Sequence, residues 1–180
     1  MIFISKIIQK YQPGQILEIG TAIGYSSLVM AENLKDNFRI DTVDASKPAV
    51  IEARGNIRKY NHSNSINVYF DKGINFLETT KNKYNLIFID AKKEEYPEYY
   101  QLSKLRLKQD GIIVLDNLIW QGKVRQNKSF ADKRVEILRQ FDSDFLNDNS
   151  GETKIYEIGD GIGVYLATNY VNENRHEFHK

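Results

Sequence analysis

The sequence predicts an α/β fold: a mostly parallel, seven-stranded sheet that ends in a C-terminal antiparallel hairpin, with helices on both faces. Two observations lead to this prediction. Short apolar runs alternate along the chain with segments of helical periodicity, which is typical of parallel strands joined by helical crossovers. The last two apolar runs follow each other across a short, glycine-containing loop, which is typical of an antiparallel hairpin. Such crossovers place helices on both faces of the sheet.

Each expected element has a local signal in the sequence. The expected strands are apolar runs bounded by turn residues, and they cover residues 16–19, 39–44, 66–70, 84–90, 111–116, 153–158 and 163–167. The expected helices have apolar residues at helical spacing, and they cover residues 3–10, 26–32, 48–60, 74–80, 94–107 and 130–146. No linker or internal repeat is visible. We therefore expect one domain over residues 1–168 and a polar tail over residues 169–180.

The composition excludes several classes of protein. The chain has 180 residues, of which 41% are hydrophobic and 27% charged, so it can build a core and a polar surface. The net charge of +1 argues against a purely electrostatic nucleic-acid binder. The absence of cysteine excludes disulfides, thiolate catalysis and zinc–thiolate sites, and it fits a cytoplasmic location. No apolar run approaches the length of a membrane span, so no membrane partner is expected.

The segment ILEIGTAIGYS, residues 16–26, predicts a ligand site made of a strand, a glycine turn and a helix start. Gly20 and Gly24 permit a ligand to approach the backbone closely, and the start of a helix presents free N–H groups. Glu18, near the end of the strand, would repel a phosphate and favours an ammonium or ribose hydroxyls. Asp44 follows Gly24 by 20 residues and ends the next strand, where an acid binds ribose in nucleotide-binding α/β folds.

An NAD-dependent oxidoreductase is the alternative from a different class. Its G-x-G-x-x-G fingerprint requires a second glycine where this chain has Ala22, and only Gly20 and Gly24 remain. The glycine pattern therefore favours another adenosine-containing ligand over NAD.

Oxygen-bearing side chains also end two further strands. Asp90 ends one strand, and Asp116, followed by Asn117, ends the next. Because the carboxyl ends of parallel strands meet at one edge, these hard oxygen donors suit Mg²⁺. Lys93 lies in the loop that overhangs the same edge. A lysine in a partly dry cleft beside a cation has its ammonium form disfavoured, so it can take a proton from a hydroxyl.

Three ordered motifs resemble a known family. ILEIGTAIGYS resembles motif I of class I S-adenosylmethionine (SAM)-dependent methyltransferases. FIDAKKEEY and LDNLIWQGKV are similar to the cation-dependent O-methyltransferases of the catechol and caffeoyl-CoA type. The resemblance extends from residue 1 to 167 and includes the segment IGDGIGVYLA. Among these enzymes, the motifs look most like those of the bacterial enzyme that methylates 5-hydroxyuridine in tRNA. It implies a Rossmann-like methyltransferase fold.

The resemblance implies roles for individual residues. SAM would be contacted by Glu18, Gly20, Gly24, Tyr25, Ser26, Asp44, Lys72, Gly73 and Asp90. Mg²⁺ or Mn²⁺ would be held by Asp90, Asp116 and Asn117, with Lys93 as the catalytic base and Trp120 near the acceptor. The chain departs from the family at residues 71–73, which read Asp-Lys-Gly where relatives usually have Gly-Asp-Ala beside the adenine.

The resemblance also implies methyl transfer to a hydroxyl with a neighbouring oxygen. The expected acceptor is 5-hydroxyuridine in tRNA, giving 5-methoxyuridine, and a small catechol-like molecule is the alternative. A basic rim that RNA could use is predicted from Lys123, Arg125, Lys128, Lys133, Arg134 and Arg139. Interspersed acids leave a solvated helix face as the other interpretation. The resemblance further implies a homodimer and N-terminal helices that are not in this sequence, so a truncated chain or an open acceptor pocket is expected.

Overall fold

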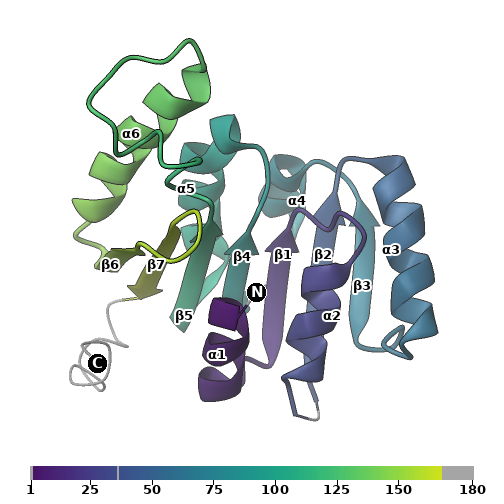
Figure 1. Ribbon diagram of the computed structural model, residues 1–180. Coiled ribbons are helices and arrows are strands. Elements are labelled where there is room, and N and C mark those ends of the chain that lie inside the picture. Colours follow the sequence, from purple (N-terminus) through teal and green to yellow (C-terminus); the bar gives the residue numbers. More distant parts are fainter. Residues whose placement is uncertain (1, 36, 168–180) are drawn as a thin grey trace.

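Seven strands form one sheet: β1 (Gln15–Ile19), β2 (Arg39–Asp44), β3 (Ile66–Phe70), β4 (Tyr84–Ile89), β5 (Leu107–Asp116), β6 (Gly151–Tyr156) and β7 (Ile162–Ala167). The computed structural model describes residues 2–35 and 37–167 (Figure 1). The strand order is β3-β2-β1-β4-β5-β7-β6. Neighbours from β3 to β5 are parallel, whereas β7 is antiparallel to β5 and β6. The predicted sheet and hairpin are confirmed.

Helices cover both faces of the sheet (Figure 1): α1 (Ile2–Tyr11), α2 (Tyr25–Glu32), α3 (Lys47–Lys59), α4 (Gly73–Thr79), the 3-10 helix η1 (Lys93–Glu95), α5 (Tyr96–Arg106) and α6 (Lys133–Leu146). Alternation along β1 separates two apolar cores. Leu17 and Ile19 belong to the core beneath α4, α5 and α6. Ile16 belongs to the core beneath α1, α2 and α3. Glu18, two residues on from Ile16, therefore points into the second core.

Several element boundaries differ from the predictions, and the differences at β5 and α6 have local physical reasons. β5 begins at Leu107 instead of residue 111, because a register shift in the β4–β5 ladder lets Leu107 pair with Tyr84. α6 begins at Lys133 instead of residue 130, because the Asp132 side chain accepts the Arg134 N–H (3.1 Å) and caps the helix there. The predicted helix over residues 94–107 is divided into η1 and α5.

The parallel strands bring their carboxyl ends to one edge of the sheet, and the functional candidates lie there. Asp44 and Asp116 are the last residues of β2 and β5, and Asp90 directly follows β4. Among residues 2–35 and 37–167, no helix has the length and apolar character needed to cross a membrane. The predicted polar tail, residues 169–180, lies outside the described residues.

Candidate active site

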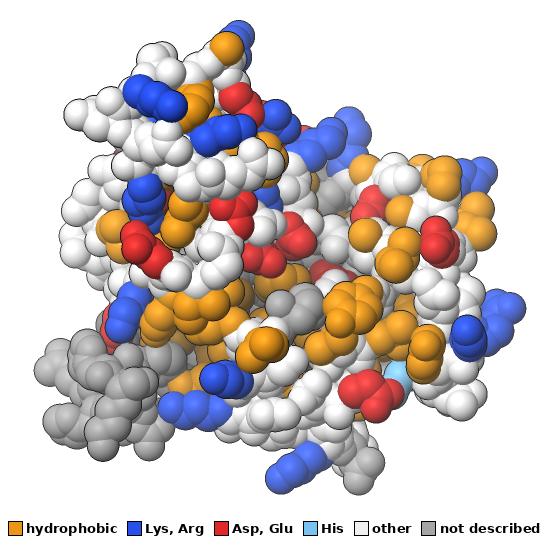
Figure 2. All heavy atoms as spheres, in the orientation of Figure 1, with side chains coloured by type: hydrophobic (Ala, Val, Ile, Leu, Met, Phe, Trp, Pro, Cys, Tyr) orange, Lys and Arg blue, Asp and Glu red, His pale blue; other side chains and the backbone are white. Residues whose placement is uncertain are grey.

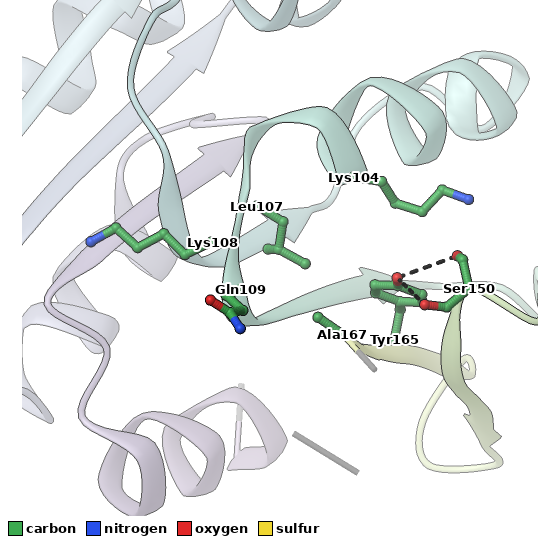
Figure 3. A pocket seen from close by; sticks show the side chains of 7 residues that line it. All are labelled: Lys104, Leu107, Lys108, Gln109, Ser150, Tyr165 and Ala167. Atoms are coloured by element: carbon green, nitrogen blue, oxygen red, sulfur yellow. Dashed lines mark hydrogen bonds between the residues drawn. The ribbon is translucent and has the colours of Figure 1, made fainter. Parts of the chain in front are cut away.

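A cavity of about 460 Å³ opens at the carboxyl ends of β1, β2 and β4. It is lined by Ile19, Gly20, Thr21, Ala22, Tyr25, Ser26, Val43, Asp44, Ala45, Lys72, Gly73, Asp90, Ala91, Lys92, Glu95 and Tyr99. A shallower cavity of about 260 Å³ lies at the opposite edge of the sheet, between the start of β5 and the end of β7 (Figure 3). Its Lys104 is already paired with Asp148 (2.6 Å), and no predicted site residue lines it.

The turn after β1 is shaped by two glycines and an acid. Gly20 has φ +103°, and a Cβ there would lie 1.9 Å from the carbonyl oxygen of Asp90, so only glycine fits. Gly24 has φ +81° and stands before α2. Asp44 holds the turn, because its Oδ2 accepts the N–H of Ala22 (2.9 Å) and its Oδ1 accepts the N–H of Ser46 (2.8 Å). The backbone and the Asp44 carboxylate therefore form one wall of the cavity.

Most of the predicted cofactor contacts line this cavity, but Glu18 and Gly24 do not. The expectation of direct contact by Glu18 needs correction. Its side chain is fully buried and accepts hydrogen bonds from the hydroxyls of Ser26, Ser27 and Thr42. The alternation of β1 explains this, since it turns Glu18 into the core instead of toward the edge. Gly24 packs against Ala53 of α3.

Lys72 and Gly73 line the cavity at the start of α4, as expected. A Cβ on Gly73 would lie 2.5 Å from Ile19 Cγ2 and 2.8 Å from Tyr99 Cε1, so this position must be small. The displaced acid Asp71 accepts the backbone N–H of Lys72 (2.7 Å), which fixes the start of the helix.

Several lining residues were not among the predicted site residues, and Glu95 and Tyr99, from the segment after β4, are two of them. The Tyr99 hydroxyl donates to Glu95 across one helical turn. Their four-residue spacing was the available signal, but spacing alone does not show which side of α5 faces the cavity.

Lys93 lies beside the acids that follow β4 and end β5. Its side chain is 5% exposed, and its ammonium donates to Asp90 Oδ1 (3.3 Å), to the Asp116 backbone carbonyl (3.1 Å) and to the Tyr96 hydroxyl. Tyr96 in turn donates to the Asp116 carbonyl (2.8 Å). Burial lowers the pKa of Lys93, while Asp90, Asp116 and Asp160 act in the opposite direction.

Asp90, Asp116 and Asn117 have the chemistry of a site for a hard cation. Burial raises the pKa of Asp116, and repulsion from the Asp90 carboxylate raises it further, so a cation would relieve an existing repulsion. Asn117 follows directly, with φ +59°. Among the described residues, no group of three or more Asp, Glu, His or Cys side chains is placed so that it could hold a metal ion. A third oxygen donor would therefore be the Asn117 amide, and the set fits Mg²⁺ or Mn²⁺.

Trp120, which was expected near the acceptor, is held by neighbours in its own segment. Its indole N–H donates to Asp132 Oδ2 (3.0 Å), and the Arg134 guanidinium lies 4.6 Å from its ring centroid. Trp120 has φ +49° and Gln121 has φ +57°, and Asp160 accepts the Gln121 N–H. This network fixes the path of the segment between β5 and α6.

The predicted basic rim is present, but its arginines have internal partners. Figure 2 shows Lys and Arg side chains over the lobe formed by residues 117–132 and α6. Arg125 pairs with Asp142 (2.8 Å), Arg134 pairs with Asp132 (2.7 Å), and Arg139 pairs with Glu136 (2.7 Å). These arginines primarily hold the lobe together.

The lysines Lys128 and Lys133 are exposed on the same lobe. They are therefore the better probes of an RNA-binding surface, because their substitution breaks no ion pair among the described residues.

Fold and site together define a class. The sheet is parallel from β3 to β5 and is extended by an antiparallel hairpin. The cavity lies beside a glycine turn and Asp44, an acid in the position that binds ribose in nucleotide-binding folds. This is a Rossmann-like methyltransferase architecture. Comparison with known proteins agrees. The sequence matches the O-methyltransferase family over residues 2–168. The chain belongs to this family.

Individual relatives support the assignment. The chain is 34% identical to a "Catechol O-methyltransferase" of Niastella koreensis, over 78% of this chain and 65% of that protein. It is 27% identical to a "Probable caffeoyl-CoA O-methyltransferase 2" of Dictyostelium discoideum, over 93% of this chain and 74% of that protein. The crystal structure of a Bacillus cereus O-methyltransferase in complex with S-adenosylhomocysteine (SAH) superposes with a TM-score of 0.83 at 26% identity, covering 92% of this chain and 79% of that one.

The comparisons do not support the NAD-dependent oxidoreductase alternative. The whole matched region falls in the O-methyltransferase family, and the related Bacillus cereus structure holds SAH. The missing second glycine at Ala22 is the sequence feature that agrees with this correction.

Proposed function

We propose that this chain transfers a methyl group from SAM to a hydroxyl oxygen of an acceptor that carries a second, neighbouring oxygen. The observation that carries the proposal is the position of Lys93. Its buried amine lies against Asp90 and Asp116, and Asp90 also lines the 460 Å³ cavity. A candidate proton acceptor, a candidate cation site and a candidate nucleoside site thus lie at one edge of the sheet.

Residues of the 460 Å³ cavity would hold SAM. Asp44 would accept hydrogen bonds from the ribose hydroxyls, as acids at this position do in nucleotide-binding folds. Tyr25 and Ser26, in the first turn of α2, would contact the methionine part, and the wall at Gly20 leaves room for it. Lys72 and Gly73 would lie toward the adenine.

Lys93 would act as the general base. Its amine accepts the proton that the acceptor hydroxyl loses as the methyl group passes from sulfur to oxygen, and SAH remains. Burial favours the neutral amine, which is the form able to accept a proton. Asp90, Asp116 and Asn117 would hold Mg²⁺ or Mn²⁺, which when bound orients two neighbouring acceptor oxygens and lowers the pKa of the reacting hydroxyl.

Two acceptor classes fit this chemistry. The Niastella koreensis relative favours a small catechol-like molecule, and the internal pairing of Arg125, Arg134 and Arg139 removes part of the case for RNA. The exposed Lys128 and Lys133 favour 5-hydroxyuridine in tRNA, whose O4 and O5 are also neighbours. A homodimer and a cytoplasmic location stay predictions from the resemblance.

One assay separates the two acceptors. The purified protein, with SAM and Mg²⁺, is offered a catechol or tRNA that contains 5-hydroxyuridine, and methyl transfer is followed by mass spectrometry. Methylation of tRNA that falls steeply with salt and with Lys128→Glu/Lys133→Glu, but not with Lys81→Glu, supports the RNA acceptor. Salt-independent methylation of the catechol supports the small molecule. Failure of both, in the longest form of the chain available, refutes the proposed reaction.

A further inference from the structure

The turn that joins β6 and β7 lies next to the candidate cation site. It rises toward the lobe formed by residues 117–132 and α6 (Figure 1). The sheet register explains this position, because Ile162, the first residue of β7, pairs with Asp116, the last residue of β5. The segment that follows Asp116 therefore runs directly along the turn.

The turn accepts three backbone N–H groups of that segment. The Gly161 carbonyl accepts the N–H of Leu118 (3.0 Å). The Asp160 carbonyl accepts the N–H of Ile119 (2.7 Å), and the Asp160 carboxylate accepts the N–H of Gln121 through Oδ1. Asp160 thus holds the segment twice, once with its backbone and once with its side chain.

Close packing fixes the turn against the segment. Gly161 has φ +85°, and a Cβ there would lie 2.4 Å from Ile119 Cγ1 and 2.9 Å from the Ile119 backbone nitrogen. Only glycine permits this approach. The approach of Gly161 to Ile119 is what brings the neighbouring Asp160 carboxylate within reach of the Gln121 N–H.

The segment needs this support because its backbone is in an unfavourable conformation. Asn117, Trp120 and Gln121 have φ values of +59°, +49° and +57°. Residues other than glycine adopt such values at an energetic cost, and they keep them only where surrounding contacts hold the backbone in place. Asn117 begins this segment, and its amide is the third oxygen donor of the candidate cation site.

We propose that Asp160 is a positioning residue that holds the segment 117–121 and thereby keeps the Asn117 amide in place for Mg²⁺ or Mn²⁺. The inference rests on the cation site of the proposed function, and it gives the motif IGDGIGVYLA, residues 158–167, a task in that site. Asp160 acts through the segment and not as a ligand of the ion. Loss of a group that orients a metal ligand typically lowers metal affinity by about 10- to 100-fold.

The first test needs no metal. Trp120 is the only tryptophan in the chain and lies inside the segment, so its fluorescence reports on the segment directly. In EDTA, Asp160→Ala should shift the emission to longer wavelength and increase quenching by acrylamide, because the Gln121 N–H loses its acceptor beside the half-buried indole. Asp110→Ala, which removes an exposed carboxylate from the first half of β5, is the control and should leave the emission unchanged.

Metal and cofactor binding separate positioning from a general structural role. Calorimetry with Mn²⁺ alone should show an affinity about tenfold weaker, or more, in Asp160→Ala. SAM affinity in EDTA should change by less than about twofold, because neither Asp160 nor residues 117–121 line the 460 Å³ cavity. Asp160→Asn keeps an acceptor oxygen for the Gln121 N–H, so it should restore both the Mn²⁺ affinity and the fluorescence.

The outcomes that would overturn the inference are distinct. Wild-type Mn²⁺ affinity in Asp160→Ala overturns it, although the proposed function stands. Equal losses of Mn²⁺ and SAM affinity would mean that Asp160 supports the fold in general. If Asp160→Asn is as impaired as Asp160→Ala, the charge of Asp160, which also acts on Lys93, matters and the held segment does not.

A second variant provides the test if Asp160→Ala does not fold. Gly161→Ala keeps the carboxylate, but its Cβ would meet Ile119, so it should displace the turn and weaken Mn²⁺ binding in the same way; unchanged Mn²⁺ affinity would overturn the inference. Mn²⁺ binding is measured without SAM or acceptor. A failed methyl-transfer assay would therefore overturn the proposed reaction without altering this result.

Discussion

Replacing Lys93 by methionine tests the proposed reaction most directly. Methionine nearly matches the lysine stem in length and suits a position that is 5% exposed. The Tyr96 hydroxyl keeps its hydrogen bonds to the carbonyls of Asp116 (2.8 Å) and Ile89 (3.2 Å), so the local fold should survive. Lys93→Met removes the three hydrogen bonds of the ammonium, but it also removes the cost of burying the charge. The free energy of unfolding should therefore change by no more than about 1–2 kcal/mol.

The expected effect is on catalysis. A general base contributes about 10²- to 10⁴-fold in rate, which corresponds to about 2.7–5.5 kcal/mol of activation free energy. We therefore expect kcat to fall by that factor, while SAM affinity, measured by calorimetry, changes by less than about threefold. Lys93 does not line the 460 Å³ cavity, which is why the affinity should be preserved.

The assay follows SAH formation with excess acceptor, and Lys81→Met serves as the control because Lys81 is exposed at the other edge of the sheet, before β4. If the Lys93→Met protein binds SAM and still retains more than about a tenth of the wild-type kcat, Lys93 is not the base and the proposed mechanism fails. If SAM affinity is lost together with kcat, Lys93 supports cofactor binding instead.

Four further predictions follow from the geometry. Asp44→Ala should weaken SAM and SAH binding by about 1–3 kcal/mol, because two backbone N–H groups lose their acceptor along with the ribose; unchanged affinities by calorimetry would exclude Asp44 from the site. EDTA should abolish methyl transfer and Mg²⁺ or Mn²⁺ should restore it, and Asp116→Ala should bind SAM without turnover; full activity in EDTA would contradict the cation site. Gly73→Ala should lower the free energy of unfolding in urea by about 1–3 kcal/mol, because the added Cβ meets Ile19 and Tyr99; no loss of stability would mean that the start of α4 shifts to make room for it. Because the pKa of Glu18 is raised to about 7, its contribution to stability should be fully present below a pH of about 4.5 and should be lost as pH rises through 7, by up to about 3 kcal/mol; a Glu18→Gln protein with the same slope between pH 5 and 7 would refute this.

The sequence by itself determined the order and type of the elements. Apolar runs such as residues 84–89 must be buried and contain β-branched and aromatic residues, so they specify strands whatever packs on them. The glycine turn after β1 was also predictable, because the left-handed backbone at Gly20 and Gly24 excludes most other residues. Strand ends in a parallel sheet share an edge, and this rule alone predicted that Asp44, Asp90 and Asp116 would gather.

Only the tertiary structure decided which way the side chains point. Glu18 was expected in the ligand site, but strand alternation turns it into the core, where three hydroxyls from α2 and β2 surround it. The partners of Arg125 come from α6 and from the segment after β6, which no local pattern connects. Glu95 and Tyr99 reach the cavity because α5 packs beside Gly73. Alternation shows only that Glu18 lies on the face opposite to Leu17 and Ile19. Which elements pack on each face, and therefore which side chains reach the cavity, depends on contacts between residues far apart in the chain.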